Sequence, residues 1–225
     1  MSDFDQTPFP DVGLAENPEP RCPCVLLVDT SSSMGGQKID QLNAGLRTFA
    51  EELRSDAMAS KRVEVAVVGF GPVRVLSHFE TADTFIPPHL EANGDTPMGA
   101  AVAEAARLIA ERKLVLRANG NTPYRPWAFL ITDGEPTDDI SSARAMIAEA
   151  EANKSIVFYA VGVDNANLDK LAMLSVRQPL RLKGMSFREL FVWLSNSLKT
   201  VSRSQPGEKP RLANPAAPNG WAEID

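Results

Sequence analysis

Apolar residues along the chain gather in short continuous runs that alternate with longer stretches of helical spacing. Four runs, at residues 25–28, 65–70, 127–131 and 156–161, contain no charged side chain. Runs of this length are typical of strands that a sheet buries on both faces. We therefore expect these four segments to form the centre of a mostly parallel sheet.

A fifth segment has a different pattern, because apolar and polar side chains alternate over residues 73–79. Such alternation is typical of a strand with one exposed face. Only Gly71 and Pro72 separate it from the run at 65–70. This spacing predicts a tight hairpin and one antiparallel strand at an edge of the sheet. Residues 180–182 are a candidate for a last short strand.

Between the strands, apolar residues recur at spacings of three and four, which places them on one stripe of a helix. The stripes cover residues 39–53, 101–109, 168–174 and 187–201, and residues 140–153 form a further Ala- and Glu-rich helix. Alternating strands and helices predict βαβ units. The expected fold class is α/β, a Rossmann-like arrangement of three layers with helices on both faces of a mostly parallel sheet.

Prolines mark two tails. Residues 1–21 hold four prolines and several acids, which predicts an extended or partly disordered lead-in. Residues 204–225 are similar. Between them there is neither an internal repeat nor a linker, so we expect one domain at 22–203. Whether the isolated aromatics of the tails (Phe4, Phe9 and Trp221) pack onto the domain is left open by the sequence.

Composition narrows the class of protein. The 225 residues, 44% hydrophobic and 23% charged, are typical of a soluble globular protein. A net charge of −6 argues against a nucleic-acid partner. No apolar run approaches the roughly 20 residues of a membrane span. The N-terminus lacks the pattern of a signal peptide, so a cytoplasmic location is expected.

The only two cysteines, Cys22 and Cys24, lead into the first expected strand. A Cys-x-Cys pair is compatible with metal binding or redox chemistry. Without further cysteines, and with His78 and His89 far away in sequence, a zinc site is not expected. We interpret the cysteines as reduced thiols, and the histidines as strand and loop residues without a catalytic role.

Three short segments place side-chain oxygens at the ends of apolar runs. Residues 29–34 carry Asp29, Ser31 and Ser33 at alternate positions, residues 94–99 carry Thr96, and residues 131–135 carry Asp133. Ligands of an open α/β sheet bind outside the carboxyl ends of its strands. We therefore expect all five side chains at the same edge of the sheet.

The five donors are all oxygens, which favours a hard cation such as Mg²⁺ or Mn²⁺ over zinc or copper. Because only two are carboxylates, a bound ion would keep an exchangeable position suited to an incoming carboxylate. Singly, each residue has a structural alternative: Ser31, Ser33 or Thr96 as a helix cap, or Asp133 as a turn residue. Together they favour a metal site.

Acids follow the last of these segments at Glu135, Asp138 and Asp139. They either tune the metal site or stabilise the start of a helix, where negative charge is favourable. We favour the helix-start interpretation.

On these motifs the chain resembles a von Willebrand factor A (vWA) domain with a metal-ion-dependent adhesion site (MIDAS). The family pattern is D-x-S-x-S, a separate Thr in a G-x-T-x-M-G-like loop, and an Asp in a T-D-G-like turn, and all three are present. The resemblance covers about residues 22–203 and implies the vWA fold. It also implies metal binding by the five residues, with an Asp or Glu of a protein partner as the last ligand. Ser32 departs from the usual glycine, at an unconstrained position.

A closer resemblance is to the bacterial cytosolic TerY-like (YegL-like) group, which is associated with tellurium resistance. It is carried by Arg-Cys-Pro-Cys at 21–24 and by residues 39–46. The group implies a stress-response, tellurite-resistance-type signalling complex with phosphatase- or kinase-like partners.

The leading hypothesis is a non-enzymatic binding module, and two alternatives stay open. The first is a Mg²⁺-dependent phosphohydrolase. A phosphoaspartate enzyme would need a second carboxylate where Ser31 stands, and no motif places a Lys or His as general acid or base. The second alternative is an adaptor subunit of an ATPase machine. The chain has no G-x-x-x-x-G-K-[ST] loop of its own.

Overall fold

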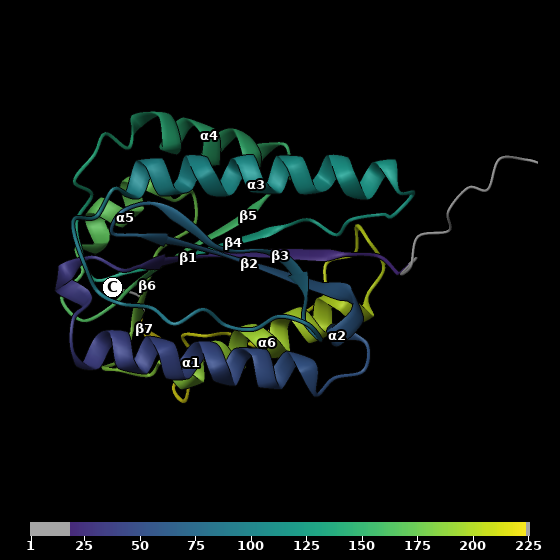
Figure 1. Cartoon of the computed structure of the whole chain (residues 1–225), viewed down its shortest axis with the longest axis horizontal. Coiled ribbons are helices and arrows are strands. Elements are labelled where there is room, and N and C mark those ends of the chain that lie inside the picture. Colours follow the sequence, from purple (N-terminus) through teal and green to yellow (C-terminus); the bar gives the residue numbers. More distant parts are fainter. Residues whose placement is uncertain (1–18, 224–225) are drawn as a thin grey trace, which may run out of the picture.

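The computed structural model describes residues 19–223, which fold around a seven-stranded sheet with the order β3-β2-β1-β4-β5-β6-β7 (Figure 1). The strands are β1 (Cys22–Asp29), β2 (Val63–Phe70), β3 (Arg74–Thr81), β4 (Trp127–Thr132), β5 (Val157–Gly162), β6 (Leu180–Leu182) and β7 (Ala222–Glu223). β3 pairs antiparallel with β2 at one edge, and β7 pairs antiparallel with β6 at the other. The remaining pairs are parallel, which confirms the predicted sheet. β7 is a second antiparallel edge strand that the sequence did not indicate.

Helices cover both faces of the sheet, as the alternating pattern predicts (Figure 1). One face carries α1 (Gln37–Arg54), the single turn α2 (Ala59–Arg62) and α6 (Phe187–Arg203), and the other carries α3 (Met98–Ala118), α4 (Ser141–Ala152) and α5 (Leu168–Leu174). Side chains of β1 alternate between two cores. Leu26 and Val28 belong to the first, and Val25 and Leu27 to the second. This alternation explains why the run is continuously apolar.

Cys22 and Cys24 are free thiols, fully buried in β1. Burial raises the pKa of Cys22 to about 12 and also raises that of Cys24. At neutral pH both thiols are therefore protonated, a state that disfavours metal binding and nucleophilic attack. His78 lies on β3 and His89 in the loop that follows it, and both side chains face solvent.

The segment after α6 packs against the domain. The indole Nε1 of Trp193 donates to the Ala213 carbonyl at 2.8 Å. Trp221, 4% exposed, packs against Trp193 with the ring centroids 5.6 Å apart and the rings tilted by 59°. Leu212 packs against the first core, and residues 222–223 form β7. The extended tail expected from its prolines is thus anchored by aromatic contacts. The lead-in expected at the N-terminus lies mostly outside the described residues, which begin at Glu19.

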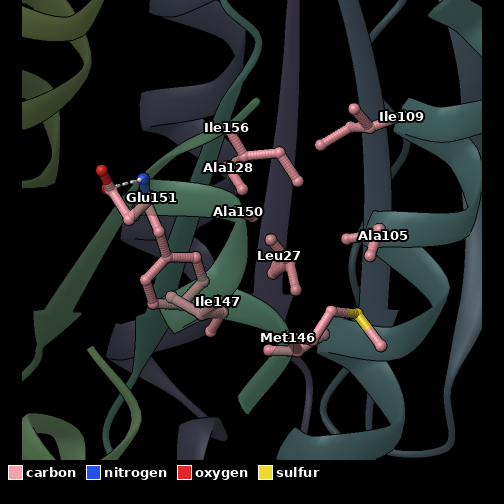
Figure 2. Close-up of a pocket in the computed structure, with 12 residues that line it drawn as sticks. Leu27, Ala105, Ile109, Ala128, Met146, Ile147, Ala150, Glu151 and Ile156 are labelled. Atoms are coloured by element: carbon pink, nitrogen blue, oxygen red, sulfur yellow. Dashed lines mark hydrogen bonds between the residues drawn. The ribbon is translucent and has the colours of Figure 1, made fainter. Parts of the chain in front are cut away.

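Packing between α3, α4 and the sheet leaves a small apolar cavity of about 20 Å³ (Figure 2). Leu27, Ala105, Ile109 and Ile147 are among its lining residues. The space is about that of one water molecule and offers it few polar partners, so it is a packing defect without a ligand. Within residues 19–223 no helix has the length and apolarity needed to cross a membrane.

Candidate metal centre

Three loops meet at the carboxyl edge of the sheet, at the left of Figure 1, and backbone hydrogen bonds join them. The N–H of Ser32 donates to the Gly94 carbonyl at 3.0 Å, and the N–H of Asn93 donates to the Thr30 carbonyl at 2.7 Å. The N–H of Thr137 donates to the Thr96 carbonyl at 3.0 Å. Backbone hydrogen bonds alone therefore hold the loop that carries Thr96 against both of the other loops.

Gly94 makes this close approach possible. Its φ is +76°, a backbone conformation that L side chains rarely adopt. A Cβ at this position would lie 1.7 Å from the Gly71 carbonyl oxygen. Only glycine fits, so the loop that presents Thr96 depends on it.

Four of the five expected side chains form a continuous series of contacts. Asp29, at the end of β1, accepts the Ser31 N–H on Oδ1 at 2.8 Å. The hydroxyls of Ser31 and Ser33 are 2.9 Å apart, and the Ser33 hydroxyl donates to Asp133 Oδ1 at 2.6 Å. The two carboxylates, far apart in sequence, are thus bridged by the two serines.

Thr96 joins this group beside Gly134. A Cβ built on Gly134 would lie 3.1 Å from the Thr96 Oγ1 and 3.7 Å from the Asp29 Oδ2. The absence of a side chain at Gly134 therefore leaves room for the two oxygens near each other. All five residues expected from the sequence lie together at this edge.

The Asp29 carboxylate is completely buried. Its Oδ2 accepts a hydrogen bond from the Thr132 hydroxyl, a contact that the sequence did not predict. Burial raises the pKa of Asp29, and the hydrogen bonds from Ser31 and Thr132 oppose this rise only in part. The nearby Asp133 carboxylate adds to it. Burial is thus the main cause of the raised pKa of Asp29, and the second carboxylate makes a smaller contribution.

Lys38, in the first turn of α1, supplies a positive charge here. Its Nζ is 2.5 Å from Asp133 Oδ2 and 3.3 Å from a carboxylate oxygen of Asp164. Burial alone would lower the pKa of Lys38, but the hydrogen bonds and negative charges of Asp133 and Asp164 together outweigh it, and the pKa is raised. Sequence reasoning missed Lys38. Its position nine residues after Asp29 would have suggested it only with the helix start known.

Two of the acids after Asp133 cap helices, and the third makes a contact between loops. The Asp138 carboxylate accepts the N–H groups of Gly99 and Ala100 at 2.9 and 2.8 Å. It therefore caps α3, the helix that the Thr96 loop opens, and not the helix that follows it in sequence. Asp139 accepts the Ser141 N–H at the start of α4. Glu135 accepts from the Asn167 side chain at 2.8 Å.

The residues present fit a hard divalent cation. Within residues 19–223 no cluster of three or more His, Cys, Asp or Glu side chains has metal-binding geometry, so hydroxyls must contribute to any site. At this edge two carboxylates and three hydroxyls provide only oxygen donors, which suits Mg²⁺ or Mn²⁺. The ammonium of Lys38 on Asp133 shows that the edge already attracts a cation.

The model of the von Willebrand factor type A domain matches residues 24–188, most of the chain. The chain belongs to this family. The match ends within α6, so the last turns of that helix and the packed tail lie beyond it. No match was found among curated protein sequences.

Solved structures share the fold of this vWA domain at low sequence identity. The SpaC pilus adhesin of Lactobacillus rhamnosus GG, in its open conformation, has a TM-score of 0.62 at 13% identity, over 82% of this chain and 31% of that chain. The vWF domain of the type V pili tip protein Mfa5 of Porphyromonas gingivalis has a TM-score of 0.61 at 12% identity, over 83% of this chain and 98% of that chain.

A third structure is proximal thread matrix protein 1 of the mussel byssus, with a zinc-occupied MIDAS motif. Its TM-score is 0.56 at 15% identity, over 82% of this chain and 49% of that chain. The chain thus spans about half of this relative and a third of the SpaC adhesin. At these identities the likeness shows the fold alone.

Proposed function

We propose that this vWA domain is a non-enzymatic, metal-dependent protein-binding module. Mg²⁺ or Mn²⁺ would be held by Asp29, Ser31, Ser33, Thr96 and Asp133, and the bound ion would offer an open coordination position to an Asp or Glu of a protein partner. The observation that supports this most directly is the convergence of five oxygen donors on one loop-built edge, with the Lys38 ammonium already attached to Asp133.

Each residue has a distinct role in this proposal. Asp29 provides buried negative charge, and the Thr132 hydroxyl orients its carboxylate. Ser31 and Ser33 carry the hydrogen-bond network across to Asp133. The backbone hydrogen bonds around Gly94 hold Thr96 in place, so binding of a metal ion would cost little conformational entropy in this loop.

The residue two positions after Asp29 also supports a binding role over hydrolysis. In a phosphoaspartate hydrolase Asp29 would be the nucleophile, and a second carboxylate would be needed two residues later. The position two residues later is Ser31 and not a second carboxylate. The setting we propose is a bacterial stress or tellurite-resistance-type signalling complex in the cytoplasm, with a phosphatase- or kinase-like partner. This setting rests on the sequence of residues 21–24 and 39–46.

Affinity capture from the source cells tests the proposal. The wild type and Asp29→Ala are each immobilised and exposed to lysate with Mg²⁺ or with EDTA. Partners retained only by the wild type in Mg²⁺ are the expected result. Equal retention in all four lanes would contradict metal-bridged binding. Turnover of phosphoesters by the wild type with Mg²⁺, lost in Asp29→Asn, would favour the hydrolase instead.

A further inference from the structure

A second concave region lies at the opposite, amino edge of the sheet. It is a cleft of about 830 Å³, formed by the end of α3, residues 123–127, the loop after α4, the start of β5 and the tail segment 207–212. We call it the basic cleft, because six cationic side chains line it: Lys113, Arg117, Arg125, Lys154, Arg177 and Lys209. Only two carboxylates, Glu151 and Glu208, lie among its lining residues. The lining is therefore strongly positive in a chain whose net charge is −6.

Ion pairs within the cleft account for only part of this charge. Glu151 pairs with Arg125 at 2.6 Å and with Arg177 at 2.8 Å. Glu208 accepts the backbone N–H of Gln205 at 2.8 Å. Four cations remain without a carboxylate partner in the part of the chain that the structure describes, and these are Lys113, Arg117, Lys154 and Lys209.

Two of the four are like charges one helical turn apart. Lys113 and Arg117 are at positions i and i+4 of α3, a spacing at which like charges repel. Burial lowers the pKa of Lys113, and the charge of Arg117 lowers it further. The helix dipole favours a cation near the end of α3 at Ala118, but it does not account for cations contributed by the α4 loop and the tail. An anionic ligand would relieve the repulsion among all of them.

The cleft does not accept an added β-strand in its present form. β6 pairs with β5 only at Val161 and Gly162, so the first half of β5 is an open edge. There the N–H of Phe158 donates to Glu151 at 2.8 Å, the dashed bond in Figure 2. The guanidinium of Arg177 covers the Tyr159 ring at 5.3 Å. These contacts occupy the open edge of β5, so a further strand cannot pair with it. A ligand in the cleft would therefore interact with its charged side chains.

We propose that the basic cleft binds an acidic peptide segment of a protein partner. This site is separate from the metal centre and does not depend on the proposed function. Charge complementarity supports a peptide with several Asp or Glu residues. The four unpaired cations come from three segments along the cleft, which suits charges distributed along a chain. Three of them are lysines, which lack the fork that binds a single phosphate in bidentate fashion.

Fluorescence anisotropy of a labelled peptide of alternating Glu and Asp tests this proposal on the full chain. Binding to the wild type is expected to persist in EDTA and to be lost at about 1 M salt, where charges are screened within about 3 Å. Lys113→Gln combined with Arg117→Gln should weaken binding roughly tenfold. The control, Arg144→Gln combined with Lys170→Gln, removes the same charge from exposed positions outside the cleft and should bind like the wild type.

Three results would overturn the proposal. They are no binding by the wild type, equal weakening in the cleft and control variants, and loss of binding in EDTA, which would place the peptide on the metal. A peptide of Gln and Asn should not bind. Circular dichroism melts of both double variants establish that they are folded, as expected for substitutions near the surface of helices.

Discussion

At the carboxyl edge of the sheet, backbone hydrogen bonds join the loops. At the amino edge, side-chain ion pairs join many of the segments. Thr30, Gly94 and Thr96 connect the first edge through their carbonyls. At the second edge Glu151 connects the α4 end, the β4 lead-in and the β6 lead-in through Arg125 and Arg177. The first arrangement leaves side-chain oxygens available for a ligand and depends on glycine. The second depends on charge and is therefore sensitive to pH and salt.

The largest expected effect comes from breaking the backbone arrangement. Gly94→Ala would place a Cβ against the Gly71 carbonyl and strain a positive φ, so we expect a loss of about 3 kcal/mol or more in the free energy of unfolding. Gly120→Ala is the matched control, because Gly120 also has a positive φ, 72°, but no atom within 4 Å of its Cβ position. It should cost about 1 kcal/mol. Urea unfolding of both variants measures the difference. Equal losses of unfolding free energy would contradict a steric clash between a side chain at position 94 and the Gly71 carbonyl.

The second effect breaks the ion pairs of the amino edge. Glu151→Gln weakens the contacts with Arg125 and Arg177, and we expect a loss of about 2 kcal/mol at pH 7. Burial would raise the pKa of Glu151, but the hydrogen bonds from Arg177 and Phe158 and the charges of Arg177 and Arg125 together outweigh it, and the pKa is lowered.

A lowered pKa fixes the sign of the pH dependence. The stabilisation by Glu151 is present above the pKa of the unfolded state, near 4.5, and is lost as the pH falls through the lower pKa of the folded state. The difference in unfolding free energy between the wild type and Glu151→Gln should therefore shrink between pH 5 and about pH 3. A difference that stays constant over this range would contradict the assigned ion pairs.

The two edges also differ in how far the sequence could predict them. Asp29, Thr96 and Asp133 each lie directly at the end of a strand or the start of a helix, so the parallel topology alone brings them together. The pairing of Lys38 with Asp133 and of Asp138 with α3 depends on how loops cross between elements, which no local pattern records. The sequence pattern did not predict the basic cleft.

The reason is that its residues come from segments without a shared motif. Glu151 belongs to an Ala- and Glu-rich helix, where its carboxylate is indistinguishable in sequence from its exposed neighbours. The tail wall near Leu212 depends on Trp221 and Trp193 packing together, and prolines alone predicted an extended segment. The tertiary packing of a few aromatic side chains therefore determines the position of the tail, which local sequence propensity did not predict.

A third, smaller effect concerns the cation already present at the carboxyl edge. A divalent ion must compete with the Lys38 ammonium for Asp133, so Lys38→Met should tighten metal binding roughly tenfold. Lys170→Met removes an equal charge from an exposed position of α5 and should leave the affinity within about twofold. The free Mn²⁺ signal in electron paramagnetic resonance measures both. Weaker binding by Lys38→Met would mean that Lys38 orders the site and does not compete.

The smallest effect separates two caps that look alike in sequence. Asp138→Ala removes the acceptor of the Gly99 and Ala100 N–H groups, and Asp139→Ala removes that of the Ser141 N–H. Each should cost about 1 kcal/mol of stability, as helix caps do. Only the first cap holds the helix that follows Thr96, so only Asp138→Ala should also weaken Mn²⁺ binding, by about threefold. Equal Mn²⁺ affinities in the two variants would show that the backbone bonds around Gly94 position Thr96 without help from α3, and that the carboxyl edge is more independent of its helices than the amino edge.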